Sequence, residues 1–287
     1  MPRAIDHLVI ASPDLEAQAA LYRRLGFQVG ARNRHPWGTE NHVVQFDGSF
    51  LELIGLGQGF AAPKSQTGVF SFAAFVESFL AKREGLAMLA MRSADAEADR
   101  EWFAAEGLGD FERLDFARKS RRPDGAEADV AFSLAFAASA AMPEAGFFVC
   151  EQKFPENFWS RAAQIHPNGA TGIKGVTLVH ESPAEAAGFL QRFANATAPR
   201  SMDGGFMLGI EGAQIECLTR KAFMARFGAG VVAPNGSTLA VARIGVADIA
   251  AASRHLDANA VVHRRLGDAL VVDADHAMGV ALVLETD

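Results

Sequence analysis

The stretch Ile5-Asp6-His7-Leu8-Val9-Ile10, followed by Ser12-Pro13-Asp14 and a helical run that ends at Gly26, decides the fold of this chain. The first run is rich in β-forming residues, and serine or aspartate at its end can cap a helix that begins near the proline. Phe27–Val29, a loop over residues 35–39, Val43–Phe46, a tight turn and Phe50–Ile54 come next. The pattern predicts one β-α-β-β-β unit over residues 5–54.

The same opening recurs along the chain. Shifted by 81 positions, it matches Leu86–Met91 without a gap, and further copies begin at Ile173 and near Leu239. Each of the four units ends in an apolar strand with a glutamate: Glu52, Glu151, Glu216 and Glu285. One β-rich run that ends in a charge is common, whereas four in order, each with a helix in the same place, indicate a repeat. We therefore predict an α+β fold of four diverged βαβββ modules.

A turn-rich passage separates the second unit from the third. Residues 154–171 contain Pro155, Asn157, Pro167, Asn168 and Gly169, and this composition suits a connection between two halves. A chain of 287 residues is also long enough for two domains with their own cores. We expect the halves to be residues 1–160 and 170–287.

The composition excludes several classes of partner. The formal charge of -7 and a sequence pI near 5.6 disfavour nucleic acid, whose binders carry clustered lysine and arginine. Two cysteines in apolar runs are too few for a disulfide framework and fit a reducing compartment. No apolar stretch approaches the roughly 20 residues that a membrane helix needs. We expect a cytoplasmic protein without a membrane segment.

Two polar residues interrupt strand faces that otherwise face an interior. Alternation along a strand puts His7 on one face with Ile5 and Val9, and Glu52 on one face with its apolar neighbours. A strand histidine is commonly only a hydrogen-bonded interior residue. A buried carboxylate, however, needs a cation, a donor or a raised pKa. We therefore predict that both side chains point into the same cavity.

Specific runs in the first unit carry a family resemblance. Ile5–Ile10, the Leu25-Gly26-Phe27 helix end, Trp37–Asn41 and Phe50–Ile54 resemble the vicinal oxygen chelate superfamily of glyoxalases and extradiol dioxygenases, and within it the glyoxalase-like domain proteins. The resemblance implies that two βαβββ units pair into a cupped mixed sheet, so that four units form two such sheets. It also implies a divalent metal held by histidine or glutamate on the first and last strands of the units.

The resemblance places metal ligands at His7, Glu52 and Glu151. Met88 occupies the remaining first-strand position and removes one ligand. A histidine with two carboxylates still suits Fe, Mn, Zn or Ni with open positions for an oxygen substrate. In the second half, two glutamates without a histidine make a poor transition-metal site, so we expect that half to be structural or a lid.

Other polar residues are candidates for substrate binding. Asn41 and His42 open the third strand, and one of them should face inward. His166 lies in the loop between the halves, where it can fold over the cavity or serve only as a turn histidine beside Pro-Asn-Gly. Arg122 and Arg118 can pair with a substrate carboxylate, although solvated loop arginines are the simpler interpretation.

Cys150 should point away from the face of its neighbour Glu151, which disfavours a nucleophilic role. No G-x-G-x-x-G or G-x-x-x-x-G-K-[ST] pattern is present, and this disfavours nucleotide chemistry.

The resemblance favours a metal-dependent enzyme of the isomerase or lyase class that acts on a small molecule with vicinal oxygens, and Glu52 or Glu151 can leave the metal to serve as the base. A ring-cleaving dioxygenase needs two histidines and one carboxylate, so His42 or His166 would have to join His7. A metal-free protein that sequesters a small molecule, and a folded dimerisation module, are further alternatives. The sequence is compatible with a homodimer and does not determine the oligomeric state.

Overall fold

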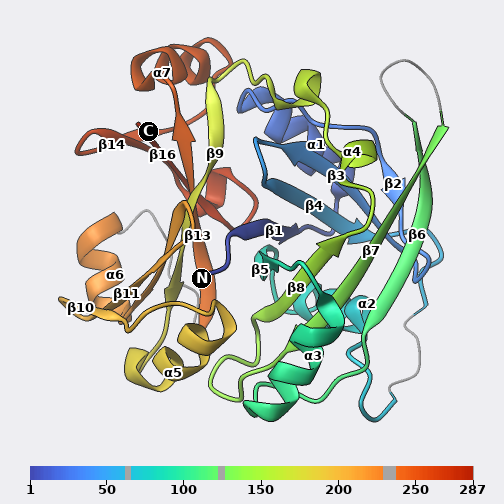
Figure 1. Cartoon of the computed structure of the whole chain (residues 1–287). Helices are drawn as coiled ribbons and strands as arrows, with labels where there is room; N and C mark the ends of the chain where they lie inside the picture. Colours follow the sequence, from blue (N-terminus) through green and yellow to red (C-terminus); the bar gives the residue numbers. More distant parts are fainter. Residues whose placement is uncertain (62–65, 122–126, 229–236, 287) are drawn as a thin grey trace.

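The computed structural model describes residues 1–61, 66–121, 127–228 and 237–286, and it contains four βαβββ modules (Figure 1). The first module consists of β1 (Ile5–Ala11), α1 (Leu15–Arg24), β2 (Asn33–Arg34), β3 (Thr39–Gln45) and β4 (Phe50–Leu56). The second consists of β5 (Gly85–Arg92), α3 (Ala96–Ala105), β6 (Leu114–Arg121), β7 (Glu127–Ala137) and β8 (Gly146–Gln152). The helix α2 (Phe72–Leu80) lies between them.

Two short helices, α4 (Pro155–Phe158) and η1 (Arg161–Gln164), lead into the other two modules. The third module consists of β9 (Ala170–Val179), α5 (Pro183–Phe193), β10 (Arg200–Met202), β11 (Gly205–Ile210) and β12 (Ala213–Leu218). After α6 (Arg220–Phe227), the fourth consists of β13 (Thr238–Val246), α7 (Ile249–Ala258), β14 (Arg264–Leu266), β15 (Ala269–Val272), η2 (Ala274–His276) and β16 (Ala281–Thr286).

The modules pair into two eight-stranded mixed sheets. The strand orders are β2-β3-β4-β1-β5-β8-β7-β6 and β10-β11-β12-β9-β13-β16-β15-β14. Within a module the first and last strands run parallel, as in β1 and β4, whereas the first strands of paired modules run antiparallel, as in β1 and β5. Figure 1 shows the second sheet, in yellow to red, beside the first, in blue to green. The predicted α+β fold of four βαβββ modules is confirmed.

The helix starts follow the predicted chemistry. Asp14, Asp95 and Asp248 accept hydrogen bonds from backbone N–H groups in the first turns of α1, α3 and α7. Pro183 begins α5, where a missing N–H costs nothing. Because each cap directly follows a first strand, the same strand-to-helix corner is built in all four modules.

The outer, helix-covered faces of both sheets share one apolar core. Phe103 of α3 and Phe147 of β8 contact Phe193 of α5, with ring centroids 6.0 and 5.3 Å apart. These rings belong to a cluster of buried residues that extends from β1 to β16. The two halves are therefore packed against each other through their helical layers.

The inner face of each sheet forms a cup with a core of its own. In the first, α2 inserts Phe72, Val76 and Phe79, and the second is filled by Phe223 and Phe227 of α6. The first sheet curls until Phe116, on its β6 edge, meets Trp37 between β2 and β3 at a ring distance of 4.9 Å. Among the described residues, no helix is long and apolar enough to cross a membrane.

Candidate active site

His7 lies at the middle of β1 with its ring fixed in the first cup. The ring stacks on Phe50 at a centroid distance of 4.2 Å, and Nδ1 donates to Oδ1 of Asp6 at 2.6 Å. Gln152 donates to the other oxygen of Asp6 at 2.9 Å. Because Nδ1 is engaged by Asp6, Nε2 is the ring nitrogen that is directed into the cavity.

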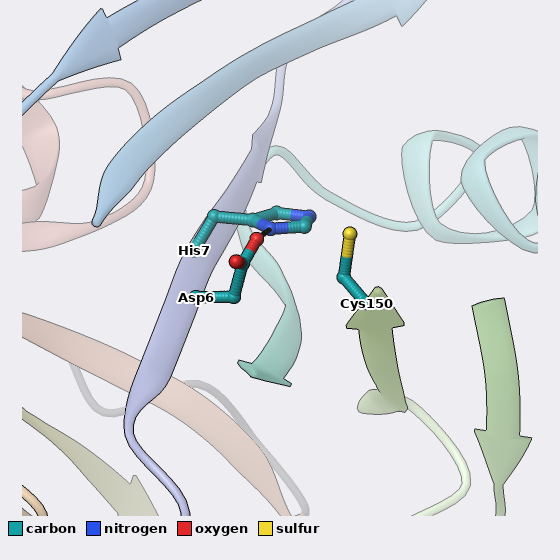
Figure 2. A group of neighbouring side chains, drawn as sticks. All are labelled: Asp6, His7 and Cys150. Atoms are coloured by element: carbon teal, nitrogen blue, oxygen red, sulfur yellow. Dashed lines mark hydrogen bonds and ion pairs between the residues drawn. The ribbon is translucent and has the colours of Figure 1, made fainter. Parts of the chain in front are cut away.

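The contact between Asp6 and His7 departs from strict strand alternation, which places neighbours on opposite faces. The pairing of β1 with β5 shifts register between Ile5 and His7, so Asp6 is the extra residue of a β-bulge. A bulge re-aims side chains, and here it brings the Asp6 carboxylate to the imidazole (Figure 2).

Glu52 of β4 is buried in the same cup, with 5% of its surface exposed. Asn41 of β3 donates to Oε1 at 2.5 Å, and Asn33 holds the Asn41 amide in place at 3.2 Å. Oε2 faces Nε2 of His7 at 3.8 Å. The structure thus brings His7, Glu52 and Asn41 together, and no described lysine or arginine lies within ion-pair distance of Glu52.

A second histidine, His35, was not among the predicted site residues. Its Nε2 lies 3.6 Å from Oε1 of Glu52, its Nδ1 contacts the Thr39 hydroxyl at 2.8 Å, and its ring stacks on Trp37 at 4.8 Å. Burial lowers the pKa of His35, and the negative charge of Glu52 only partly opposes this effect. The sequence feature that could have identified His35 is the His-Pro-Trp-Gly-Thr loop, in which a histidine and an aromatic residue precede a strand.

Aromatic side chains form the walls of the cavity above these polar groups. The lining rings come from the first and second modules, from α2 and from α4: Trp37, Phe50, Phe72, Phe116, Phe132, Phe148 and Phe158. Arg118 of β6 and Cys150 of β8 also line the cavity. Burial, followed by the charge of Asp6, raises the pKa of the Cys150 thiol. The thiol is therefore protonated, which disfavours a nucleophilic role.

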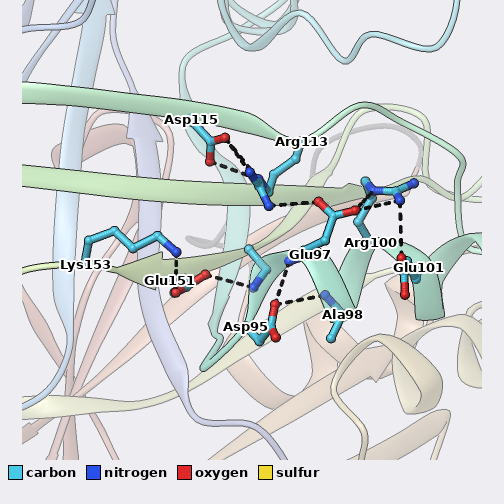
Figure 3. A network of polar contacts seen from close by, with 10 residues as sticks. Asp95, Glu97, Ala98, Arg100, Glu101, Arg113, Asp115, Glu151 and Lys153 are labelled. Carbon is cyan, nitrogen blue, oxygen red and sulfur yellow. Dashed lines mark hydrogen bonds and ion pairs between the residues drawn. The ribbon is translucent and has the colours of Figure 1, made fainter.

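Glu151 is not brought to His7 and Glu52. Its carboxylate accepts from the backbone N–H of Ala96 at 3.0 Å and contacts Lys153, on the outer side of β8 (Figure 3). Cys150 takes the inward face instead. The strand register explains this placement. Glu52 pairs with Val9 of β1. The residue of β5 that corresponds to Val9 is Ala90, 81 positions later, and it pairs with Phe148. Phe148 therefore occupies the position that corresponds to Glu52.

The remaining predicted residues lie elsewhere. His42 faces away from the cup, where Nδ1 donates to the Gly30 carbonyl at 2.8 Å. His166 stays between the halves, where Nδ1 accepts from Gln28 N–H at 2.9 Å and Nε2 donates to the Gln45 carbonyl at 2.8 Å. Burial lowers the pKa of His166. Arg122 lies outside the described residues.

The first-module residues fit a divalent metal and the second-module residues do not. Nε2 of His7 and Oε2 of Glu52, 3.8 Å apart, can share a cation with bonds of about 2.0–2.2 Å. The counterparts in the second module, Met88 and Phe148, supply a thioether and a phenyl ring. One atom each of Asp6, His7 and Cys150 also lie within 4.8 Å of one another, but the raised pKa of the thiol disfavours the thiolate that a metal needs.

In the second cup, the glutamate that corresponds to Glu52 has different neighbours. Glu216 pairs with Thr177 on the adjacent strand, as Glu52 pairs with Val9, and it is 2% exposed. Arg226 and Arg243 neutralise its Oε1 at 3.0 and 3.2 Å, and Thr177 donates to Oε2 at 2.9 Å. Gly175 stands where the first cup has His7, and a Cβ there would lie 2.5 Å from the Gln214 carbonyl oxygen. The described residues of the second cup therefore provide no histidine–glutamate pair.

Comparison with solved structures shows the fold. A hypothetical protein from Staphylococcus aureus superposes with a TM-score of 0.68 at 11% identity, over 99% of this chain and 100% of that chain. A mutant of 4-hydroxymandelate synthase from Streptomyces coelicolor gives 0.56 at 15%, over 92% and 77%. A xylose isomerase-like TIM barrel/4-hydroxyphenylpyruvate dioxygenase fusion protein gives 0.54 at 13%, over 100% and 50%.

Sequence comparison identifies the family. A search of curated proteins finds no match. The model of the glyoxalase-like domain family, in contrast, matches residues 5–194, which include the whole first cup and the opening of the second half. The chain therefore belongs to the glyoxalase-like domain family, within the vicinal oxygen chelate superfamily.

Proposed function

We propose that this protein is a small-molecule enzyme of the isomerase or lyase class whose active centre is the His7–Glu52 pair in the first cup. One observation carries the proposal: a buried carboxylate, Glu52, faces Nε2 of His7 at 3.8 Å, and no described lysine or arginine lies within ion-pair distance of it. A buried carboxylate without a counter-charge is costly to stability, so the arrangement favours a ligand or a cation at this point.

The described residues divide the work of such a reaction. Oε2 of Glu52 accepts no hydrogen bond from a described residue, so when it does not bind a cation it can take a proton from a carbon next to a carbonyl group. Asn41 holds the other carboxylate oxygen at 2.5 Å and fixes its direction. The aromatic walls bind the organic part of the substrate and exclude water, which strengthens the electrostatic interactions inside.

His7 and Glu52 would also hold a divalent metal such as Fe, Mn, Zn or Ni. When bound, the metal supplies Lewis-acid polarisation of two neighbouring oxygens of the substrate. Asp6 orients the imidazole as carboxylates commonly do for histidine ligands. Met88 and Phe148 contribute no ligand, so His7 and Glu52 would be the residues of the two paired modules that hold the metal.

A second candidate, a dioxygenase, is favoured by His35. With Nε2 of His35 at 3.6 Å and Nε2 of His7 at 3.8 Å from Glu52, the cup contains two histidines and one carboxylate, the set used by non-haem Fe(II) oxygenases. The Asn41 amide, however, contacts both Oε1 of Glu52 and Nε2 of His35. This amide would have to move for His35 to reach a shared metal, so we rank proton transfer first.

Metal analysis of purified variants tests the proposal. We expect a stoichiometric divalent metal in wild type, its loss in His7→Ala and Glu52→Gln, and its retention in the control Glu285→Gln, whose carboxylate pairs with Arg243 in the second cup. His7→Ala should still fold, because one interior imidazole contributes only about 1–3 kcal/mol through its hydrogen bonds.

The outcomes separate the candidates. Iron with oxygen consumption that is lost in His35→Ala would favour the dioxygenase. Wild type that takes up no metal, even when Fe, Mn, Zn or Ni salts are supplied, yet retains small molecules in the cup would replace the enzyme by a binding protein. If His7→Ala contains as much metal as wild type, the proposed centre is wrong.

A further inference from the structure

One cationic side chain in the first cup, Arg118, has no anion within ion-pair distance among the described residues. Arg118 lies on β6, where it pairs with Val130 of β7 and lines the cavity together with Phe116 and Phe132. Its neighbour Lys119 points to the opposite face and binds Asp129 at 2.7 Å. Strand alternation thus separates a solvated lysine from an arginine that faces the cavity.

The guanidinium of Arg118 makes no hydrogen bond and no ion pair with any residue that the structure describes. By comparison, Arg113 pairs with Asp115 at 2.8 Å, and Arg243 pairs with Glu285 at 2.9 Å. Burial lowers the pKa of Arg118, and Glu52 acts on it only through longer-range attraction. A largely buried cation without a hydrogen-bond or ion-pair partner is unfavourable, so among the described residues this position is open to an anionic ligand.

We propose that Arg118 binds the carboxylate of an aromatic carboxylic acid, whose ring lies among the phenylalanine and tryptophan side chains of the cup. The proposal rests on the proposed function for the role of Glu52, and it names the substrate class of that site. A carboxylate at Arg118 places the rest of the molecule between the cup walls, in the cavity that His7 and Glu52 also line. The anion is thereby held on the β6 side, apart from Glu52.

The chemistry of the cavity favours a carboxylate over other anions. A planar guanidinium matches one carboxylate with two parallel hydrogen bonds. A phosphate monoester carries nearly two charges, so a single arginine would leave a second charge inside an aromatic cavity. A neutral ligand would leave the guanidinium unpaired, which costs binding free energy.

Calorimetric binding to metal-stripped protein tests this inference without relying on turnover. The probes are benzoate, phenylacetate and 3-phenylpropionate, each with its neutral amide. We expect at least one acid to bind wild type about tenfold or more tightly than its amide. In Arg118→Met the affinity for that acid should fall about 10- to 100-fold, while the affinity for the amide stays within a few-fold.

Two further variants sharpen the result. Lys119→Met removes a charge from the same strand on the outer face and should leave every affinity unchanged. Arg118→Lys keeps the positive charge but loses the two parallel N–H donors of the guanidinium, so it should retain only part of the preference for the acid. A thermal melt of each variant checks that the fold is retained.

The inference is overturned if no acid binds in the millimolar range, if wild type does not prefer the acid, or if Arg118→Met weakens acid and amide equally. Its failure is distinguishable from failure of the proposed function. If His7→Ala and Glu52→Gln keep both the metal content of wild type and the preference for the acid, the proposed centre fails and the anion subsite stands. If metal binding depends on His7 but Arg118→Met is without effect, only the subsite fails.

Discussion

Two glutamates at equivalent positions show how one residue type acquires different roles. Glu216 in the second cup is compensated by Arg226, Arg243 and Thr177. Glu52 in the first cup has one amide donor and two imidazoles at 3.6 and 3.8 Å. A compensated buried carboxylate is a structural element, whereas one that lacks a counter-charge is available to a ligand. The difference is in the neighbours, not in the glutamate.

His166 gives a prediction for acid stability. Its Nδ1 accepts from Gln28 N–H, so the folded form requires the neutral ring, and burial lowers its pKa. The pKa of the unfolded chain, about 6.5, is then the higher of the two, and the unfolded state takes up the proton first as pH falls. Stability is therefore fully present above about pH 6.5 and is lost as pH falls from there through the lower pKa of His166 in the folded protein.

His166→Gln should lose less stability than wild type between neutral and mildly acidic pH. Urea unfolding on either side of about pH 6.5 measures the difference. His276→Gln, at an exposed site, should behave as wild type does. An equal loss in wild type and His166→Gln would show that another group governs the acid response.

At the scale of single elements, small irregularities position the site. The bulge at Asp6 lets neighbouring residues of β1 act together. Because neighbouring residues of β8 face opposite sides of the sheet, Cys150 lines the cup, whereas Glu151 accepts a hydrogen bond from the first turn of α3. Shifting a strand by one residue would exchange these two roles.

Glu151→Ala should therefore destabilise the fold without changing the site. We expect a loss of about 0.5–2 kcal/mol, because the first turn of α3 loses an acceptor for the Ala96 N–H and a favourable negative charge. Denaturant unfolding measures this loss, and metal content and ligand affinity should equal those of wild type. Glu101→Ala, on the exposed side of α3 (Figure 3), is the control and should be nearly neutral. Loss of metal in Glu151→Ala would contradict the placement of this residue outside the cup.

At the scale of the whole molecule, the two halves are tightly joined. Their helical layers share one buried apolar cluster, and Gly85 of the first half meets Gly279 of the second so closely that a Cβ on Gly85 would lie 2.3 Å from the Gly279 carbonyl oxygen. We propose that residues 1–160 carry the function and that residues 170–287 support them.

The shared core predicts one cooperative unfolding transition for the full chain. Apolar interfaces of this kind couple the stability of the parts, so calorimetric and van't Hoff enthalpies should agree. Residues 1–160 expressed alone should be much less stable, because Phe103 and Phe147 lose their contacts with α5. Two separate transitions in scanning calorimetry would contradict this expectation.

The sequence by itself determined the four modules. Strand runs, aspartate caps and helix-ending glycines act within about ten residues of one another, and their recurrence identifies the repeat regardless of distant contacts. The same local alternation put His7 and Glu52 on interior faces.

Only the tertiary structure decided which other groups share the cup. His35 reaches Glu52 from a loop, Arg118 faces the cavity from a distant edge strand, and Glu151 yields the inward face to Cys150. Each of these side-chain placements depends on strand register, on a β-bulge or on the curl of the sheet. These features are set by the packing of many residues far apart in the chain, because a shift of one residue reverses the face that a side chain presents.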